Sequence, residues 1–450
     1  METITYLNLK IEGTPISKVT QLEIKNAINT YGSATITGEV SLAEGEAFVS
    51  RADGTTEVRI TTTASGQPPV LFVGVVDKSS ISKMADYAVL TVHLKATASR
   101  LDLQKKNKSY QNSGSTYEEI INQSLGGKAT LVMQVSDKAI GQMIMQYQET
   151  PWEFAGRMAS MFEAPISANV TTDIPVITVG VPKGSKSYDL PDVEYVSASE
   201  EENTSSISGT GIITAQYMEL GDKVTYGGAS GQVGQLQATI SGGILRTKIS
   251  VAKKDRLVQK PHYNQTVSGR MLKGIVQAVE KDKVQVHLVD IDESYDNGGN
   301  LWLPYSTAYS SGDGSGFYCM PQEQDEVRVF FPSDNEKDAF AASSVNVSPL
   351  DNPQHKKWRS PAGKEILLTE GGIYITCKGE KIFINLEDEN GITISSDKDI
   401  NVMTVNNMLL YAQRQLTVQA EKKILLSTGS SYIDMTPEEI QMAGNKILIK

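Results

Sequence analysis

The sequence predicts a mainly β protein with two barrels, a helical insertion between them, an OB-fold barrel, and a C-terminal β-helix needle of three intertwined chains. Three observations lead to this prediction. Segments rich in Val, Ile and Thr recur through most of the 450 residues and are typical of strands. Helix-starting motifs interrupt them in one interval. From residue 365 to the end, a strand and a turn repeat about every eight residues.

The composition of the chain argues against several classes of function. The formal net charge of -11 argues against a general nucleic-acid binder and against binding to anionic membranes. Cys319 and Cys377 lie far apart and form no metal or redox motif, which fits synthesis in a reducing cytoplasm. The N-terminus lacks the basic and apolar regions of a signal peptide, and no apolar run is long enough to span a membrane. We expect no cofactor and no metal.

Residues 1–100 are predicted to form the first barrel. Runs of β-branched and aromatic residues alternate with Gly, Ser and Asp breaks, as in a small barrel or sandwich. These residues by themselves indicate no function. The strands are expected at Ile4–Ile11, Ala34–Val40, Val58–Ile60, Val70–Val73 and Val89–Leu94.

Residues 101–165 are predicted to be a helical insertion. The first helix begins at a capping box, Ser115–Glu118, and ends at Gly126–Gly127. The second begins at Thr150–Glu153, which combines a cap, a proline at the first helical position and an acid at the third. Its apolar stripe is typical of a core rather than of a ligand pocket. The stripe consists of Phe154, Met158, Met161 and Phe162.

Residues 166–265 are predicted to be a second barrel that matches the first in size and composition. Its glycine-rich stretch is not a phosphate-binding loop, because no Gly-Lys-Ser/Thr accompanies it, and we expect a mobile surface loop. The glycines are Gly227, Gly228, Gly231 and Gly234. The strands are expected at Val176–Val179, Ile212–Ala215 and Thr247–Val251.

Residues 266–348 are predicted to form a five-stranded barrel of the OB type. An acidic loop holds Asp290 and Asp292, but Tyr295 and Leu301 occupy the positions where an EF-hand needs Gly and Glu. A solvated acidic turn is the favoured interpretation, with a loosely bound ion as the alternative. The strands are expected at Gly274–Val279, Lys283–Leu288, Leu301–Tyr305, Glu326–Phe331 and near Ala339.

A linker at 349–364 precedes the repeat at 365–450. Each repeat holds one alternating strand and one turn, so a single chain cannot enclose a core. We therefore expect three chains to wind together, each supplying one face of a triangular prism. A sandwich or meander is the alternative, disfavoured because only Asn390-Gly391 and Thr428-Gly429 resemble tight hairpin turns. The residues expected at the trimer interface are Ile366, Ile373, Ile382, Ile392, Ile400, Leu409, Leu416, Ile424, Ile433 and Ile440.

Several motifs follow one another in an order that resembles a known family. The helix Thr150–Ala159 and the tail Ser431–Met442 are two of them. The predicted OB barrel contributes Gly274-Ile-Val, Trp302-Leu-Pro-Tyr, Gly314-Ser-Gly316 and Asp325-Glu-Val-Arg-Val. Together they resemble the VgrG-type hub and spike proteins of contractile injection systems, which include phage tails, tailocins and type VI-like machines.

The resemblance implies a non-enzymatic homotrimeric hub and membrane-puncturing spike. The barrels of three chains would seat against a sixfold inner tube among baseplate proteins, and the needle would meet the target cell envelope when the particle contracts. A PAAR-like tip protein would cover Ile447, Leu448, Ile449 and Lys450. Since no histidine follows His355, a tip that the chain builds around a His-bound metal is not expected.

Enzymatic functions are weighed against this prediction. Residues 351–363 leave room for a linker only, and no Gly-x-Ser-x-Gly elbow occurs. The alternative function is a trimeric tailspike-like β-helix protein that binds or cleaves carbohydrate. Such faces usually carry aromatic clusters, whereas the needle has only Tyr374, Phe383, Tyr411 and Tyr432.

Overall fold

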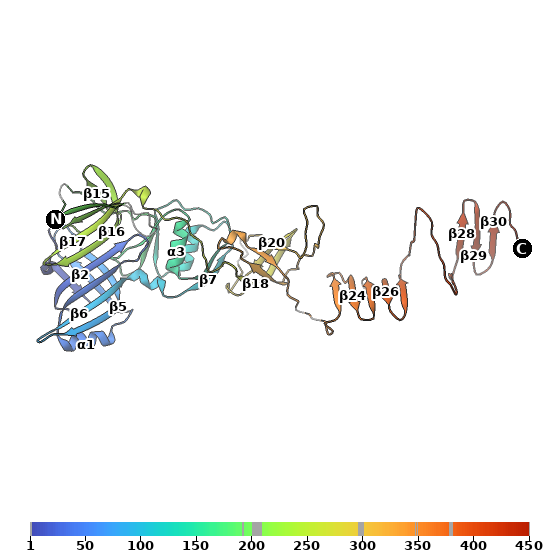
Figure 1. The fold of residues 1–450 in the computed structure, drawn as a ribbon, viewed down its shortest axis with the longest axis horizontal. Helices are drawn as coiled ribbons and strands as arrows, with labels where there is room; N and C mark the ends of the chain where they lie inside the picture. Colours follow the sequence, from blue (N-terminus) through green and yellow to red (C-terminus); the bar gives the residue numbers. More distant parts are fainter. Residues whose placement is uncertain are drawn as a thin grey trace. The chain divides into compact units, whose positions relative to one another are not determined.

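The computed structural model describes residues 2–190, 193–199, 209–295, 301–346, 348, 350–377 and 381–449. The chain divides into two compact units, Met1–Val347 and Ser348–Lys450, called here the N-terminal and C-terminal units. Strands dominate both units, and the α-helices lie in the N-terminal one (Figure 1). The predicted mainly β class is confirmed.

One large sheet joins the two strand-rich blocks of the N-terminal unit. Its strands are β1 (Leu9–Glu12), β2 (Lys18–Ala27), β3 (Ser33–Val40), β4 (Glu57–Thr62), β5 (Val70–Lys83), β6 (Ala88–Ala96), β12 (Ser187–Asp189), β13 (Tyr195–Ser199), β14 (Gly209–Thr214), β15 (Lys223–Tyr226), β16 (Ala229–Ser241) and β17 (Ile244–Ala252). The order is β1-β4-β5-β6-β3-β2-β16-β17-β14-β13, with β15 beside β16 and β12 beside β15. The blocks meet where β2 pairs antiparallel with β16 and Ile24 lies opposite Ala238. The two barrels expected from the sequence thus share a sheet, because each block satisfies the backbone groups of the other's edge strand.

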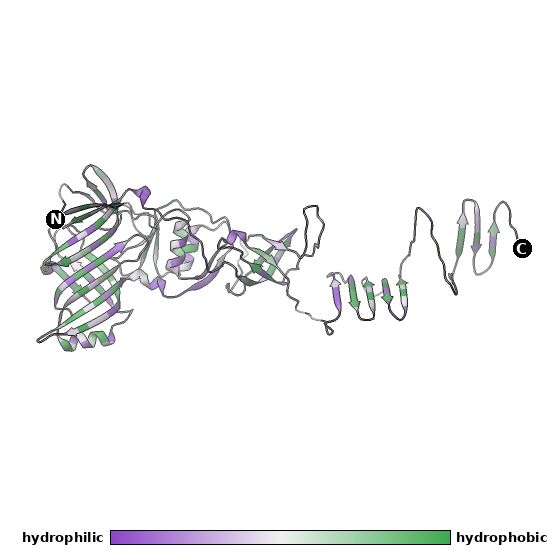
Figure 2. Cartoon of the chain, in the orientation of Figure 1, coloured by the Kyte–Doolittle hydropathy of each residue, from purple (hydrophilic) through white to green (hydrophobic). Residues whose placement is uncertain are grey.

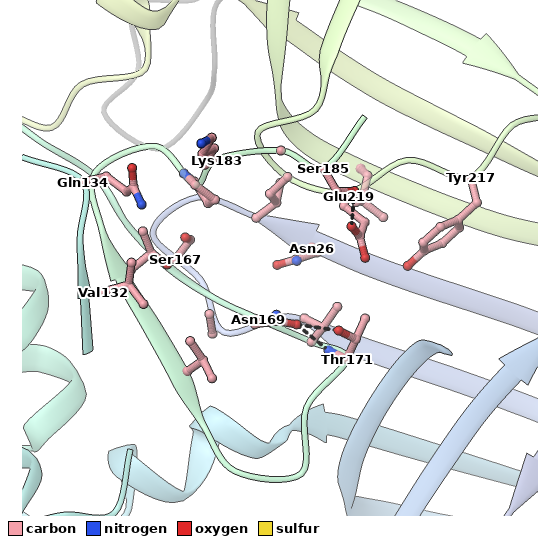
Figure 3. Close-up of a pocket in the computed structure, with 18 residues that line it drawn as sticks. Asn26, Val132, Gln134, Ser167, Asn169, Thr171, Lys183, Ser185, Tyr217 and Glu219 are labelled. Carbon is pink, nitrogen blue, oxygen red and sulfur yellow. Dashed lines mark hydrogen bonds between the residues drawn. The ribbon is translucent and has the colours of Figure 1, made fainter. Parts of the chain in front are cut away.

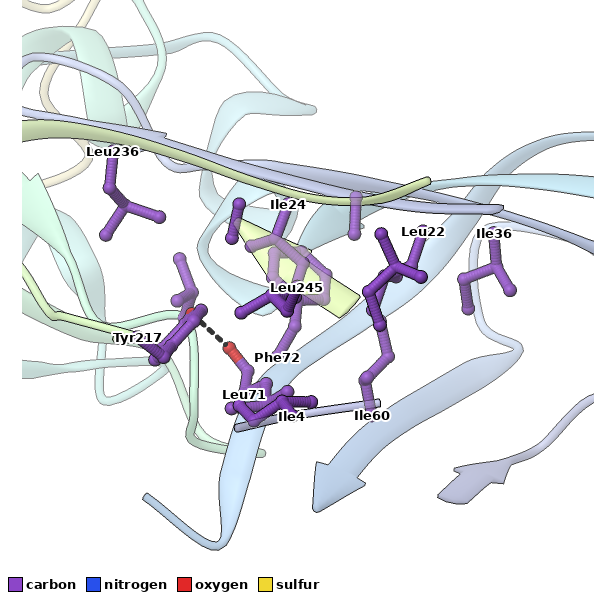
Figure 4. Close-up of a cluster of buried hydrophobic side chains, with 14 of the residues drawn as sticks. Ile4, Leu22, Ile24, Ile36, Ile60, Leu71, Phe72, Tyr217, Leu236 and Leu245 are labelled. Carbon is purple, nitrogen blue, oxygen red and sulfur yellow. Dashed lines mark hydrogen bonds between the residues drawn. The ribbon is translucent and has the colours of Figure 1, made fainter. Parts of the chain in front are cut away.

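A single core packs against this sheet. Ile24 and Phe72 from the first block and Leu236 from the second are all buried in it (Figure 4). The buried hydroxyl of Tyr217 donates a 2.9 Å hydrogen bond to the Leu71 carbonyl, which offsets the cost of removing it from water. The core is shared because strand side chains alternate, so each block turns every second residue toward the same interior.

Helix α3 (Pro151–Ser160) begins where the sequence predicts. Glu153 N donates to Thr150 Oγ1 at 3.1 Å, and Thr150 N donates to Glu153 Oε2 at 2.8 Å, which completes the capping box. Phe154 and Met158 are fully buried, which confirms the predicted core stripe. The helix packs against a small sheet ordered β10-β11-β8. The nearby strands are β7 (Lys106–Tyr110), β8 (Thr130–Met133), β9 (Ile144–Glu149), β10 (Ile166–Ala168) and β11 (Val176–Val179).

Helix α2 (Tyr117–Leu125) begins one residue later than predicted. Its capping box pairs Thr116 with Glu119. The Ser115 carbonyl accepts a 2.8 Å hydrogen bond from Ile140 N, and Ser115 lies in a bend just before the helix. The sequence motif therefore identified the helix but not its first residue.

Two features of the large sheet differ from expectation. Helix α1 (Leu42–Arg51) was not predicted, although the Ser41 side chain caps it by accepting from Glu44 N. Gly231 and Gly234 lie within β16 rather than in a surface loop. A Cβ on Gly231 would stand 2.8 Å from the Ala252 carbonyl, so the close approach of β17 requires glycine there.

The third strand-rich block forms a closed barrel, as predicted. Its strands are β18 (Met271–Glu280), β19 (Lys283–His287), β20 (Leu303–Ser306), β21 (Glu326–Phe330) and β22 (Phe340–Ala342). They close in the order β18-β19-β20-β22-β21. A Cβ on Gly274 would lie 2.2 Å from Val286 Cγ1, so any larger residue at that position would displace the Val286 side chain from the barrel interior. Assignment to the OB class remains a prediction.

The C-terminal unit consists of two antiparallel sheets and the chain between them. The first sheet contains β23 (Lys356–Arg359), β24 (Glu365–Thr369), β25 (Gly372–Thr376), β26 (Phe383–Glu387) and β27 (Gly391–Ser395). The second contains β28 (Ile424–Thr428), β29 (Ser431–Met435) and β30 (Ile440–Ala443). Among the described residues of this unit, none is buried.

Candidate interaction surface

The acidic loop of the barrel takes part in structural hydrogen bonds. Asp292 accepts from both the backbone N, at 2.8 Å, and the hydroxyl of Ser109 on β7. Asp290 accepts from Lys273 N at 3.0 Å. Burial raises the pKa of Asp292 even though the Ser109 bonds act to lower it. Asp292 is therefore half-buried and structural rather than a solvated turn residue, and the described residues contain no cluster of three potential metal ligands.

A cavity of about 360 Å³ opens beside the large sheet, lined by Asn26, Lys183 and Glu219 among others (Figure 3). The Ser185 hydroxyl donates to Glu219 Oε2 at 3.3 Å. Burial, and after it the neighbouring Asp222, raises the pKa of Glu219. The described residues around the cavity include no histidine or cysteine that could activate or act as a nucleophile.

A buried ion network ties the closed barrel to helix α3. Arg157 is 2% exposed, and its Nε and Nη2 donate to the two carboxylate oxygens of Glu149 at 2.8 and 2.9 Å. Its Nη1 donates to Oε1 of Glu336, from the barrel, at 3.2 Å. Burial opposes the charge of Arg157, but the two carboxylates raise its pKa above the ordinary value. The sequence analysis did not identify Arg157. Its helical spacing from Phe154, which is buried, could have indicated that Arg157 is buried as well.

One face of the four strands β24 to β27 is entirely aliphatic. Strand side chains alternate, so the pairing register places one set of residues on the same face in two adjacent columns. The first column is Ile366, Ile375, Ile384 and Ile394, and the second is Leu368, Ile373, Leu386 and Ile392. We call these eight residues the aliphatic face. The opposite face carries polar residues such as Asn385 and Thr393, and the alternation is visible as green bands in Figure 2.

The aliphatic face is largely open to solvent in the single chain. Apart from Ile366, its residues are 37% to 70% exposed. Soluble monomers rarely expose a contiguous apolar patch of this kind, so the face is a candidate interface. The second sheet repeats the pattern on a smaller scale. Its columns are Ile424, Met435 and Ile440, and Leu426, Ile433 and Met442.

The structure unites six of the residues predicted for the trimer interface on these two faces. Ile366, Ile373 and Ile392 belong to the aliphatic face, and Ile424, Ile433 and Ile440 to the face of the second sheet. Ile382, Ile400, Leu409 and Leu416 lie outside the strands. The predicted tip residues Ile447, Leu448 and Ile449 are exposed and follow the last strand, and Lys450 lies outside the described residues.

Within one chain the sheets are hairpin meanders, which the sequence disfavoured. Gly391 and Gly429 have φ values of 81° and 56°, as the predicted turns require. Glu370 and Gly371 join β24 to β25 as a further two-residue turn that was not recognised. A meander and an assembly of several chains are compatible, because the meander leaves its aliphatic face without a partner.

None of the helices in the described residues is long and apolar enough to cross a membrane.

Sequence comparisons with known proteins give one partial match. The family described as the Alg8 N-terminal domain matches residues 1–190, which is less than half of the chain. No curated protein matches the sequence.

Solved structures share the fold over most of the chain. One is the E. coli c3393 protein, described as a component of the type VI secretion system with structural similarity to the T4 bacteriophage tail proteins gp27 and gp5. It is 17% identical, with a TM-score of 0.51 over 75% of this chain and 99% of that chain. VgrG-complex chains from Francisella give a TM-score of 0.55 at 9% identity in the half-lidded PdpA-VgrG structure, covering 88% of each chain. The lidless PdpA-VgrG complex gives 0.53 at 10% identity, over 86% of this chain and 97% of that one. The chain thus has the fold of VgrG-type hub and spike proteins, as the motifs predicted.

Proposed function

We propose that the chain is a non-enzymatic, homotrimeric central hub and membrane-puncturing spike of a contractile injection system. The observation that carries this proposal is the aliphatic face, which no part of the described C-terminal unit buries. Burying a large aliphatic side chain fully is worth about 1.5–3 kcal/mol, so each of these partly exposed residues has roughly 1 kcal/mol still to gain from association. Three chains that turn these faces inward form a closed prism.

The remaining partners are those that the resemblance to VgrG-type proteins implies. The N-terminal unit would contact the inner tube protein and the baseplate proteins. A PAAR-like tip protein would cover the apolar end at Ile447, Leu448, Ile449 and Lys450. The protein would be made in the cytoplasm, assembled at the end of a phage tail-like particle, and delivered to the target envelope on contraction.

The oligomeric mass of the full chain tests the proposal. One chain has a mass of 48.9 kDa, and light scattering should report three times this value. Ile384→Asp places a charge within the aliphatic face and should dissociate the trimer, whereas Asn385→Asp, on the opposite face of β26, should not. A stable monomer would contradict the proposed homotrimeric spike. A trimer that cleaves polysaccharide and does not copurify with tube and sheath would support the tailspike-like alternative.

A further inference from the structure

The cavity of about 360 Å³ beside the large sheet lies where three parts of the N-terminal unit meet. Asn26 comes from β2, Ser167 from β10, and Glu219 from the chain between β14 and β15 (Figure 3). Its volume is within the range of small-molecule sites, and it would hold on the order of ten water molecules. The cavity is therefore large enough for a small organic molecule.

Asn26 brings an unsatisfied amide to this cavity. It continues the buried side of β2 after Leu22 and Ile24, at a position where the alternation would otherwise place an aliphatic residue. The side chain is 4% exposed, and among the described residues none donates a hydrogen bond to its Oδ1. A buried acceptor without a partner is costly, whereas leucine there would bury apolar surface instead. The enclosed amide therefore indicates a partner that is not part of the described chain.

Two charges of opposite sign line the same cavity. Glu219 is half-buried, its carboxylate accepts from the Ser185 hydroxyl at 3.3 Å, and no described residue forms an ion pair with it. Burial, and after it Asp222, raises the pKa of Glu219, as expected of a carboxylate without a cation in contact. Lys183 is exposed, and within the described part of the chain its ammonium group has no ion-pair partner. Both charges are available to a ligand.

We propose that this cavity binds a small zwitterion of the α-amino acid type, free or as a dipeptide. The ammonium group of the ligand pairs with Glu219 and donates to Asn26 Oδ1, and its carboxylate pairs with Lys183. A purely cationic ligand would face Lys183 and a purely anionic one would face Glu219, so the two charges select a molecule that carries both signs. The site belongs to the N-terminal unit alone and is independent of the proposed trimer.

Saturation-transfer NMR on the purified full-length chain detects the weak binding of small molecules. The probes are the common amino acids, and the one that binds best is then tested as its N-acetyl derivative, as its amide and as a dipeptide. We expect saturable binding with a Kd on the order of 1 mM or below. The N-acetyl derivative, which has no ammonium group, should bind at least about tenfold more weakly.

The derivatives also decide between ligand classes. The amide lacks the carboxylate and should bind about two- to fivefold more weakly; an amide that binds as tightly as the amino acid would indicate a cation site and overturn the zwitterion. The tighter of the amino acid and the dipeptide identifies the source of the ligand, and either result supports the proposal. If no probe binds at concentrations on the order of 10 mM, the proposal is overturned and water fills the cavity.

Substitutions separate this site from binding elsewhere on the chain. Glu219→Gln removes the charge but keeps an oxygen for Ser185, and it should weaken binding about tenfold to a hundredfold. Lys183→Gln should weaken it about two- to fivefold. The control is Lys223→Gln, which changes an exposed lysine of β15 that does not line the cavity and should leave the affinity unchanged. Equal affinities for Glu219→Gln and Lys223→Gln would overturn the proposal.

Asn26→Leu provides a second readout that does not require a ligand. It replaces the unsatisfied amide by an apolar side chain, so it should raise the thermal midpoint of the ligand-free chain while it weakens binding about tenfold. A variant that binds the amino acid as tightly as the unmodified chain would contradict the assigned role of Asn26.

Discussion

Truncation of Ile375 tests whether the aliphatic face lies inside an assembly. Ile375 is in the first column, between Ile366 and Ile384, and is 40% exposed in the single chain. Leu367 lies on the neighbouring strand β24 but points to the opposite face. Ile375→Ala and Leu367→Ala therefore remove similar apolar groups from opposite faces of the same sheet.

The exposed fraction sets the size of the expected effect. Full burial of an isoleucine side chain is worth at most about 3 kcal/mol, so the 40% that association would cover contributes about 1 kcal/mol per chain. Three copies meet at one level of the prism, so the lost burial in Ile375→Ala should destabilise the trimer by up to about 3 kcal/mol. The cavity that remains at a closed interface would add to this cost.

The assay is the thermal dissociation of the full-length trimer, followed by light scattering and by gel mobility without boiling. Ile375→Ala should dissociate at a clearly lower temperature than the unmodified chain, and Leu367→Ala should stay close to it. Equal shifts for the two variants, or a larger shift for Leu367→Ala, would refute the assignment of the aliphatic face to the interior.

Three further predictions concern the N-terminal unit. Arg157→Met strands two buried carboxylates and should lower the free energy of unfolding by about 3–5 kcal/mol in urea titrations, and a loss below 1 kcal/mol would contradict the network. Folding raises the pKa of Asp292, so the folded chain holds that proton more tightly and loses stability as the pH rises from about 4 through the folded pKa. Asp292→Asn should remove the contribution of this carboxyl to the pH dependence of the urea midpoint. If the urea midpoint of the variant depends on pH as that of the unmodified chain does, the raised pKa of Asp292 is contradicted. Gly221 has a φ of 83° and a Cβ there would stand 2.0 Å from the Pro182 carbonyl, so Gly221→Ala should cost at least about 2 kcal/mol in thermal melts. The control Gly54→Ala, with no atom within 4 Å of the added Cβ, should be nearly neutral.

The helices illustrate how far local signals extend. The Thr150–Glu153 motif located α3, because a capping box involves only residues in one turn of chain. At α2 the same signal was one residue out, because a hydrogen bond from Ile140 determines where the helix begins. The strands of the closed barrel were likewise predictable one by one from their alternation.

The candidate site was predictable in part for the same reason. Alternation at Ile366 and Ile373 showed that each strand has an apolar side, which is a property of neighbouring residues. The pairing register, which brings Ile375 against Ile384, depends on turns whose chemistry was only partly recognised. The absence of strands from residues 396–423, which the structure describes throughout, could not be foreseen, since the eight-residue repeat continues through them without interruption.

The sequence by itself determined the mainly β class, the place of α3, the strands of the closed barrel and the eight-residue repeat of the C-terminal unit. These features depend on interactions between side chains and backbone groups a few residues apart, so they can be predicted from the local sequence. Only the tertiary structure decided that Ala27 pairs with Gln235, which joins the two strand-rich blocks into one sheet. The same holds for the ion pair between Glu336 of the closed barrel and Arg157 of helix α3. Such contacts join segments far apart in the chain, and their free energy depends on packing, burial and charge pairing that arise only when the whole unit is folded.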